Sequence, residues 1–251
     1  MATFAATDGT IVGFLDRGQG PAVLLLHGFA ANAGVNWERS GVIGALADAG
    51  YRVLAADLRG HGRSGTPHQP EAYGAARFVD DATGLLDHLG LGAAAIVGYS
   101  LGSRVAMLAA AADPRFRAVV LGGAGARSMT DPDEQTAESL AAAMEAPRAS
   151  EVSGRGRAFR SFAEATGSDL VALAALQRAL PSWPAPVPAG IRVPVLVVAG
   201  TNDDLAGPPG PLAERFPNGQ AATVPGNHMN AVTNRAFAEA VVGFLDRLPR
   251  W

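Results

Sequence analysis

Apolar residues in the first half of the chain form two kinds of segment that alternate. Short continuous apolar runs, such as Ala22 to Leu26, are typical of strands buried on both faces. Between them lie longer segments with helical spacing, such as Phe78 to Leu89, which ends at Gly90. The predicted strands are Thr3–Ala6, Ile11–Asp16, Ala22–Leu26, Arg52–Ala56, Ala93–Val97 and Ala118–Leu121, and the predicted helices are Ile43–Ala49, Phe78–Leu89 and Ser103–Ala112. This alternation predicts an α/β fold with a mostly parallel central sheet and helices on both faces.

The pattern changes between about Arg127 and Ala189, where no strand is evident. Three helices are predicted there, separated by Pro, Gly and Ser: Glu134–Ala146, Gly156–Ala165 and Asp169–Leu180. The sheet pattern returns at Val193–Ala199 and Ala221–Val224, before a last helix over Ala231–Leu248. Helices inserted between strands of one sheet are best interpreted as a lid. We therefore predict a core of residues 1–125 and 191–251 and a helical cap of residues 126–190.

Composition narrows the function classes. The 251 residues are 48% hydrophobic and 17% charged, as in an ordinary folded enzyme and unlike a disordered chain. The net charge of −3 gives no electrostatic basis for binding nucleic acid. Cysteine is absent from the sequence, which excludes thiol nucleophiles, Cys-ligated zinc and disulfides. The start at Met1 does not resemble a signal peptide, and no apolar run reaches the ~20 residues of a membrane span, so we expect a cytoplasmic protein without a membrane partner.

The most informative motif is Gly98-Tyr99-Ser100-Leu101-Gly102, which lies between a predicted strand and a predicted helix. In a strand–turn–helix of this kind, the two glycines are needed because a Cβ at either position would collide with the neighbouring strand or helix. The turn exposes a serine hydroxyl beside the first free N–H groups of the helix. Ser100 could also be a simple helix N-cap. The other motifs favour a catalytic nucleophile.

Four further motifs occur in order along the chain. They are His27-Gly28-Phe29, Asp57-Leu58-Arg59-Gly60-His61-Gly62-Arg63-Ser64, Gly200-Thr201-Asn202-Asp203 and Gly226-Asn227-His228. With these motifs the chain resembles the α/β-hydrolase superfamily over almost its whole length. The resemblance implies that fold, a nucleophile elbow at Ser100 and a catalytic triad in the order Ser100, Asp203, His228.

The chemistry explains these residue types. A serine hydroxyl needs a base during attack, histidine has a suitable pKa, and a carboxylate fixes the imidazole tautomer. The resemblance also implies an oxyanion hole formed by the backbone N–H groups of Phe29 and Leu101. The acid has an adjacent competitor, Asp204, but the family spacing favours Asp203.

The sequence indicates the substrate-contacting residues less clearly than the catalytic ones. The candidates are Phe29, Tyr99, Met129, Met144 and Trp183, and Phe159 and Phe162 of the cap are further pocket-lining candidates. Packing between the cap and the core explains the five cap residues equally well. Three arginines of the cap, Arg155, Arg157 and Arg160, suggest either an anionic substrate or, more simply, a solvated basic face.

We therefore expect a serine hydrolase without cofactor or metal that cleaves a small or medium carboxylic ester or lactone. Haloalkane dehalogenases and epoxide hydrolases of this superfamily use Asp as the nucleophile, so Ser100 argues against both. Carbon–carbon bond hydrolases, perhydrolases and acyltransferases stay open, although Gly102-Ser103 departs from the Gly-Gly that many of the first two carry. A ligand-binding module with a vestigial site is the non-enzymatic alternative. The oligomeric state is not predicted.

Overall fold

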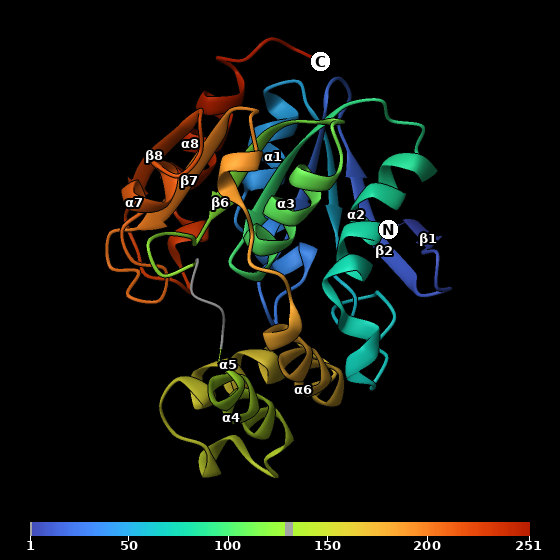
Figure 1. The fold of residues 1–251 in the computed structure, drawn as a ribbon, viewed down its shortest axis with the longest axis vertical. Coiled ribbons are helices and arrows are strands. Elements are labelled where there is room, and N and C mark those ends of the chain that lie inside the picture. The colour runs from blue at the N-terminus through green and yellow to red at the C-terminus, as the bar shows by residue number, and fades with distance from the viewer. Residues whose placement is uncertain (1, 129–132) are drawn as a thin grey trace.

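The computed structural model describes residues 2–128 and 133–251. Within these residues an eight-stranded sheet forms the centre, in the order β1-β2-β4-β3-β5-β6-β7-β8 (Figure 1). The strands are β1 (Ala2–Ala5), β2 (Ile11–Arg17), β3 (Ala22–Leu26), β4 (Arg52–Ala56), β5 (Ala94–Tyr99), β6 (Phe116–Gly122), β7 (Val195–Gly200) and β8 (Gly219–Val224). Strand β2 pairs antiparallel with β1 and with β4, and all later neighbours pair in parallel. The predicted mostly parallel sheet is confirmed.

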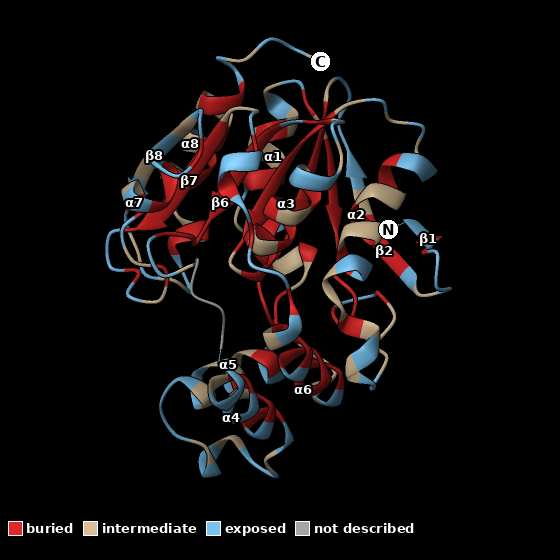
Figure 2. Ribbon diagram, viewed as in Figure 1, coloured by how far each residue is buried: buried red, intermediate tan, exposed pale blue. Residues whose placement is uncertain are grey.

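Two hydrophobic cores lie on the two faces of the sheet. On one face, side chains of α1 (Val42–Asp48) and α8 (Arg235–Leu245) pack on the strands. On the other face, α2 (Ala75–His88) and α3 (Leu101–Ala112) do so. Alternate residues of β3 enter opposite cores, which is why the run Ala22–Leu26 is apolar at every position. Figure 2 shows these central strands as buried.

Some element boundaries differ from the prediction. The predicted last helix over Ala231–Leu248 is a 3-10 turn, η6 (Ala231–Thr233), followed by α8. The break occurs because the Asn234 side chain caps the new helix, accepting the N–H of Ala236 at 3.0 Å. The sequence reasoning also missed α7 (Gly210–Ala213) and the short π-helical turn η1 (Gly34–Glu38).

Three further helices lie beyond the sheet, at the lower end of Figure 1: α4 (Glu134–Glu145), α5 (Gly154–Ala165) and α6 (Leu170–Ala179). Each lies within a few residues of its predicted bounds. Their outward faces are largely exposed (Figure 2). A 3-10 turn, η2 (Pro70–Tyr73), lies before α2. Three more lie between or after the three helices: η3 (Ala149–Glu151), η4 (Leu180–Ser182) and η5 (Pro188–Gly190). We call residues 126–190 the cap, and these bounds remain a prediction.

Several side-chain contacts attach the cap to the rest of the chain, and two of them involve Trp183 and Thr166. Trp183 donates its indole N–H to the carbonyl of Tyr73 at 2.8 Å, and its ring lies 4.9 Å from that of Phe78. Thr166 donates its hydroxyl to the carbonyl of Ala30 at 2.9 Å. The second contact joins the cap to the loop after β3, which borders the candidate site.

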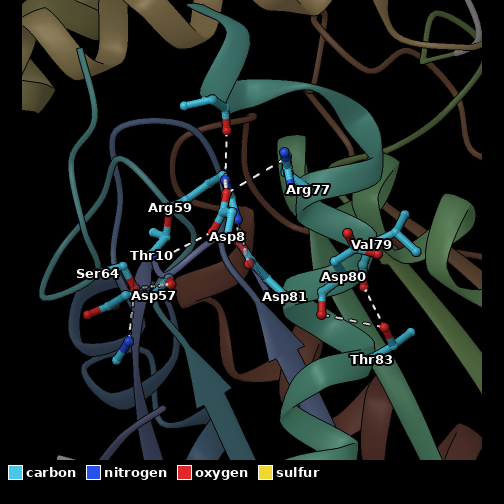
Figure 3. A network of polar contacts seen from close by, with 12 residues as sticks. Asp8, Thr10, Asp57, Arg59, Ser64, Arg77, Val79, Asp80, Asp81 and Thr83 are labelled. Atoms are coloured by element: carbon cyan, nitrogen blue, oxygen red, sulfur yellow. Dashed lines mark hydrogen bonds and ion pairs between the residues drawn. The ribbon is translucent and has the colours of Figure 1, made fainter. Parts of the chain in front are cut away.

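A buried arginine organises the segment after β4 (Figure 3). The Arg59 side chain is fully buried and donates two hydrogen bonds of 2.7 Å to the Asp81 carboxylate. It also donates to Asp8 at 3.0 Å and to the carbonyl of Ala72 at 2.7 Å. Because the charge is buried, losing one carboxylate partner would cost on the order of 3–5 kcal/mol.

The Asp57 carboxylate shapes the turn that follows β4. It accepts the backbone N–H groups of Ala33 at 2.7 Å and Arg63 at 2.9 Å, so it joins the loops after β3 and β4. Gly62 has φ +55°, and a Cβ there would lie 2.3 Å from an oxygen of this carboxylate. The hydrogen bonds of the Asp57 side chain therefore hold two loops together.

No helix in the described ranges has both the length and the apolar character needed to cross a bilayer.

Candidate active site

Ser100 occupies a strained turn between β5 and α3. Its backbone has φ 52° and ψ −112°, a region that L-residues rarely adopt. A Cβ on Gly98 would lie 2.2 Å from the carbonyl oxygen of Gly102, and one on Gly102 would lie 2.0 Å from that of Leu26. The predicted steric need for both glycines is confirmed. The strand, turn and helix can approach this closely only without side chains at these two positions.

Three side chains from distant parts of the chain meet at this turn. The Ser100 hydroxyl donates to Nε2 of His228 at 2.9 Å. Nδ1–H of His228 lies 3.0 Å from both carboxylate oxygens of Asp203. Asp203 follows β7 and His228 follows β8, so parallel strands bring all three to the same edge of the sheet. Side chains of these types at these distances can serve as a nucleophile, a base and an orienting acid.

Asp203 and Asp204 have different surroundings. The Asp203 side chain is fully buried and also accepts the N–H of Ala206 at 2.8 Å. Asp204 is exposed, and its carbonyl oxygen accepts a hydrogen bond from Arg127. Of these two carboxylates, Asp203 is the one that contacts His228.

Tyr99 supports the histidine through its hydroxyl, which donates to the backbone carbonyl of His228 at 2.8 Å. The two rings lie 5.9 Å apart. Burial raises the pKa of the Tyr99 phenol, so the phenol stays protonated and able to donate. The hydroxyl is therefore engaged with the loop that carries His228.

The loop after β3 lies directly beside Ser100. A Cβ on Gly28 would lie 3.5 Å from the Cβ of Ser100, an ordinary contact distance, so this loop packs against the serine. Within the described residues, the backbone N–H groups of Phe29 and Leu101 have no hydrogen-bond acceptor. Two backbone N–H groups of residues that line the same cavity as the serine are thus unpaired among the residues described.

Two buried histidines hold this loop in place through hydrogen bonds. Nε2 of His61 accepts the N–H of Ala30 at 3.1 Å, and Nε2 of His27 accepts the N–H of Leu58 at 2.9 Å. Burial lowers the pKa of His27 to about 4 and that of His61 to about 3. Both rings are neutral near pH 7, which leaves Nε2 free to accept these bonds.

Two cavities meet at Ser100. The larger, about 450 Å³, extends along α3 toward the cap, and the smaller, about 160 Å³, lies beside the loop after β3. Four residues line both cavities: Phe29, Ser100, Phe159 and His228. A molecule bound at the serine can therefore place two groups in two separate spaces.

The structure corrects part of the predicted substrate contacts. Phe29 lines both cavities and Tyr99 lines the smaller one. Met144 and Trp183 are buried in side-chain packing and line neither cavity, so we no longer propose them as substrate contacts. Met129 lies outside the described residues. Packing within the cap and against α2 uses the side chains of Met144 and Trp183.

The three cap arginines do not form one basic face. Arg160 is buried and donates to the carbonyls of Ala143, Met144 and Ala146, at the end of α4. Arg155 and Arg157 are exposed, and of these only Arg155 lines the larger cavity. Arg160 is therefore a structural group that stabilises a helix terminus.

Comparison with known proteins identifies the family. The sequence profile of the alpha/beta hydrolase fold matches residues 21–176, more than half of the chain. This chain belongs to the α/β-hydrolase family. The family predicted from the five motifs is confirmed.

The curated relatives of this α/β hydrolase that match well are named epoxide hydrolases. One from Caballeronia sordidicola is 41% identical over 115 residues, which is 45% of this chain and 34% of that protein. Epoxide hydrolase B of Mycobacterium tuberculosis is 43% identical over 104 residues, 41% of this chain and 28% of the relative. The match therefore spans about a third of the length of these relatives.

Solved structures of similar fold cover nearly the whole chain. A hydrolase from Pseudomonas aeruginosa has a TM-score of 0.81 at 27% identity, covering 97% of each chain. The enol-lactonase from Burkholderia xenovorans also has a TM-score of 0.81, at 25% identity, covering 98% of this chain and 100% of the other.

Sequence reasoning missed several residues around the site of this α/β hydrolase. Asn36 accepts the N–H of Gly28 at 3.2 Å, and Gln177 lines the larger cavity from the cap. Phe159, a candidate from the sequence, lines both cavities. An uncharged polar residue in the largely apolar helix Leu170–Ala179 is a signal that could have identified Gln177. Among the described residues, no group of three His, Asp or Glu side chains converges as a metal site.

Proposed function

We propose that this α/β hydrolase is a serine hydrolase that cleaves a small or medium carboxylic ester or lactone without a cofactor. The observation that carries the proposal is the hydrogen-bonded series from Asp203 through His228 to Ser100, at 3.0 and 2.9 Å. These groups supply a nucleophile, a base and an orienting carboxylate from the chain itself.

The first half-reaction forms an acyl-enzyme. Oγ of Ser100 attacks the carbonyl carbon while its proton passes to Nε2 of His228. The tetrahedral oxyanion accepts the backbone N–H groups of Phe29 and Leu101. One such donor contributes roughly 3–4 kcal/mol in the transition state. The C–O bond then breaks, and His228 returns the proton to the departing alkoxide, which leaves as an alcohol.

The second half-reaction restores the enzyme. Water attacks the acyl carbon and transfers a proton to Nε2 of His228. The bond to Oγ breaks, Ser100 regains its proton from His228, and a carboxylic acid leaves. Asp203 stabilises the imidazolium in both halves.

The two cavities support the size of the proposed substrate. An ester carbonyl at Ser100 would direct its acyl and alkoxy parts into different spaces, of about 450 and 160 Å³. The smaller space fits only a compact group. A lactone would place its single ring at the junction of the two.

The names of the curated relatives favour a second candidate, the hydrolysis of epoxides. Chemistry argues against it for this chain. A carboxylate that opens an epoxide forms an ester, which water can cleave at the acyl carbon. A serine would form an ether, which has no acyl carbon and would leave the enzyme blocked. Residue 100 is serine, so we propose acyl chemistry.

A direct experiment tests the proposal. The intact chain is treated with a fluorophosphonate probe, and hydrolysis of p-nitrophenyl acetate and butyrate is followed with Ser100→Ala as the control. We expect the probe to label Ser100 and the variant to lose on the order of 10⁶ in kcat.

Three results would redirect the proposal. Equal slow rates in both proteins, without labelling, would favour a ligand-binding module. Labelling without ester turnover would favour acyl transfer or carbon–carbon bond cleavage. Turnover of styrene oxide but of no ester would favour the epoxide hydrolase candidate.

A further inference from the structure

Gln177 is a buried polar residue on an otherwise apolar face of α6. Only 4% of its surface is exposed, and the residues around it in the helix, Ala172 to Leu176 and Ala179, are buried and apolar. In the described part of the chain, its side-chain amide has no hydrogen-bond partner. The amide opens onto a cavity instead of being enclosed by protein atoms, so a bound molecule can pair with it.

The amide faces the larger cavity. Gln177 and Leu180 line this cavity from the cap, together with Ser100 and His228 from the core. The lining residues at and along α3 include Ser100, Arg104 and Met107, which are one or two turns apart. At 1.5 Å per residue the cavity therefore follows the helix for about 10 Å away from the serine. A chain attached to an ester at Ser100 has room to reach the part lined by the cap.

Two of the three arginines that line the cavity are engaged with the protein, and the third, Arg155, is exposed. Arg104 lies over the ring of Trp183 at 5.4 Å and donates to the carbonyl of the same residue at 3.3 Å. Arg127 donates to the carbonyl of Asp204. Arginine and aspartate side chains both line the space, so no single sign of charge dominates. An uncharged polar group is the ligand that a neutral amide fits best.

We propose that Gln177 determines the substrate class, namely an ester or lactone whose chain carries an uncharged ketone or hydroxyl oxygen remote from the scissile carbonyl. This inference rests on the proposed serine hydrolase function. The amide can donate its N–H to a ketone oxygen, and it can both donate to and accept from a hydroxyl. The substrate would thus supply the partner that the protein does not.

The test compares p-nitrophenyl esters of straight-chain acids with their methyl-ketone counterparts, over acyl chains of graded length. The proteins are the wild type, Gln177→Leu and Gln135→Leu. Gln135 is an exposed glutamine of α4 and controls for the substitution itself. We expect the wild type to prefer a keto ester over its parent by about tenfold in kcat/KM, the effect of one hydrogen bond.

Gln177→Leu should lose this preference, so that its keto-to-parent ratio of kcat/KM falls to about one, and Gln135→Leu should keep the preference. A keto-to-parent ratio that is the same in wild type and Gln177→Leu would overturn the inference. So would an equal loss on both esters in a folded variant. The unfolding midpoint is measured alongside, and Gln177→Met replaces the leucine variant if the latter does not fold.

Binding separates this inference from the proposed function. In Ser100→Ala, calorimetry with diketones and monoketones of equal length needs no turnover. Tighter binding of a diketone that Gln177→Leu abolishes would support the inference even if no ester is cleaved, and only the hydrolase proposal would then fail. No diketone preference would overturn the inference whatever the hydrolysis assay shows.

Discussion

At the scale of single residues, Ser100 shows how a local strain supports a reactive position. Its left-handed backbone costs on the order of 1–3 kcal/mol and persists only because the surroundings enforce it. The N–H of Ser100 donates to the carbonyl of Gly122 at 2.8 Å, and its own carbonyl accepts the N–H of Ser103 at 2.9 Å. Strand and helix thus hold the turn from both sides.

The choice between two adjacent carboxylates is also a residue-scale question. Asp203→Asn should reduce kcat by about 10⁴-fold, because the amide cannot hold the His228 tautomer or stabilise its imidazolium. Asp204→Asn should change kcat far less, since the Asp204 side chain does not contact His228. Steady-state kinetics on a p-nitrophenyl ester measure both. A larger loss in Asp204→Asn would reverse the assignment of the acid.

Residue-scale prediction from the sequence succeeded where a motif defines a turn. It failed for Met144 and Trp183, because the direction of the side chain decides whether such a residue lines the cavity. Both were chosen because large apolar residues of a cap can line a pocket. Their apolar surface is instead buried against other helices, which the sequence alone could not show.

At the scale of elements, the contact between α3 and β3 depends on Gly102. We expect Gly102→Ala to be strongly destabilised or insoluble, because its Cβ would lie 2.0 Å from the carbonyl oxygen of Leu26 and neither backbone can yield cheaply. Urea unfolding followed by circular dichroism measures the effect.

Gly44 in α1 provides the matched control. Nothing lies within 4 Å of a Cβ at this position. Gly44→Ala should therefore raise the free energy of unfolding by roughly 0.5–1 kcal/mol through helix propensity. If both alanine variants unfolded at the wild-type urea concentration, close packing at the turn would not explain the glycine at 102.

Most elements could be predicted because their signals are local. A continuous apolar run predicts a buried strand, and a glycine or proline predicts where a helix ends. The exceptions were the short elements η1 and α7 and the break between η6 and α8. A break such as that at Asn234 needs a specific hydrogen bond between side chain and backbone, which hydrophobic spacing does not contain.

At the scale of the whole molecule, stability should depend on the buried histidines His27 and His61. Their pKa values are lowered by burial from 6.5 to about 4 and about 3. Below pH 6.5 the unfolded chain therefore takes up protons that the folded chain does not. The stability is fully present above pH 6.5 and is lost as the pH falls toward 4 and 3, by at most about 1.4 kcal/mol per pH unit for each histidine.

Urea titrations at several pH values between 7 and 4 measure this loss. His61→Gln keeps an acceptor for the N–H of Ala30 but cannot titrate, so the difference between wild type and variant should shrink as the pH falls. His68→Gln serves as a control because His68 is exposed. A constant difference across the pH range would exclude the buried histidine as the source.

The sequence by itself determined the alternation of strands and helices, the glycine-flanked serine turn and the chain order of Ser100, Asp203 and His228. These depend on spacing and on backbone sterics over a few residues. Only the tertiary structure decided which cap side chains reach the cavity, placing Gln177 there and Met144 in the interior. The physical reason is that the direction in which a helix presents a side chain depends on how that helix packs on its neighbours, and those neighbours lie far away in the chain.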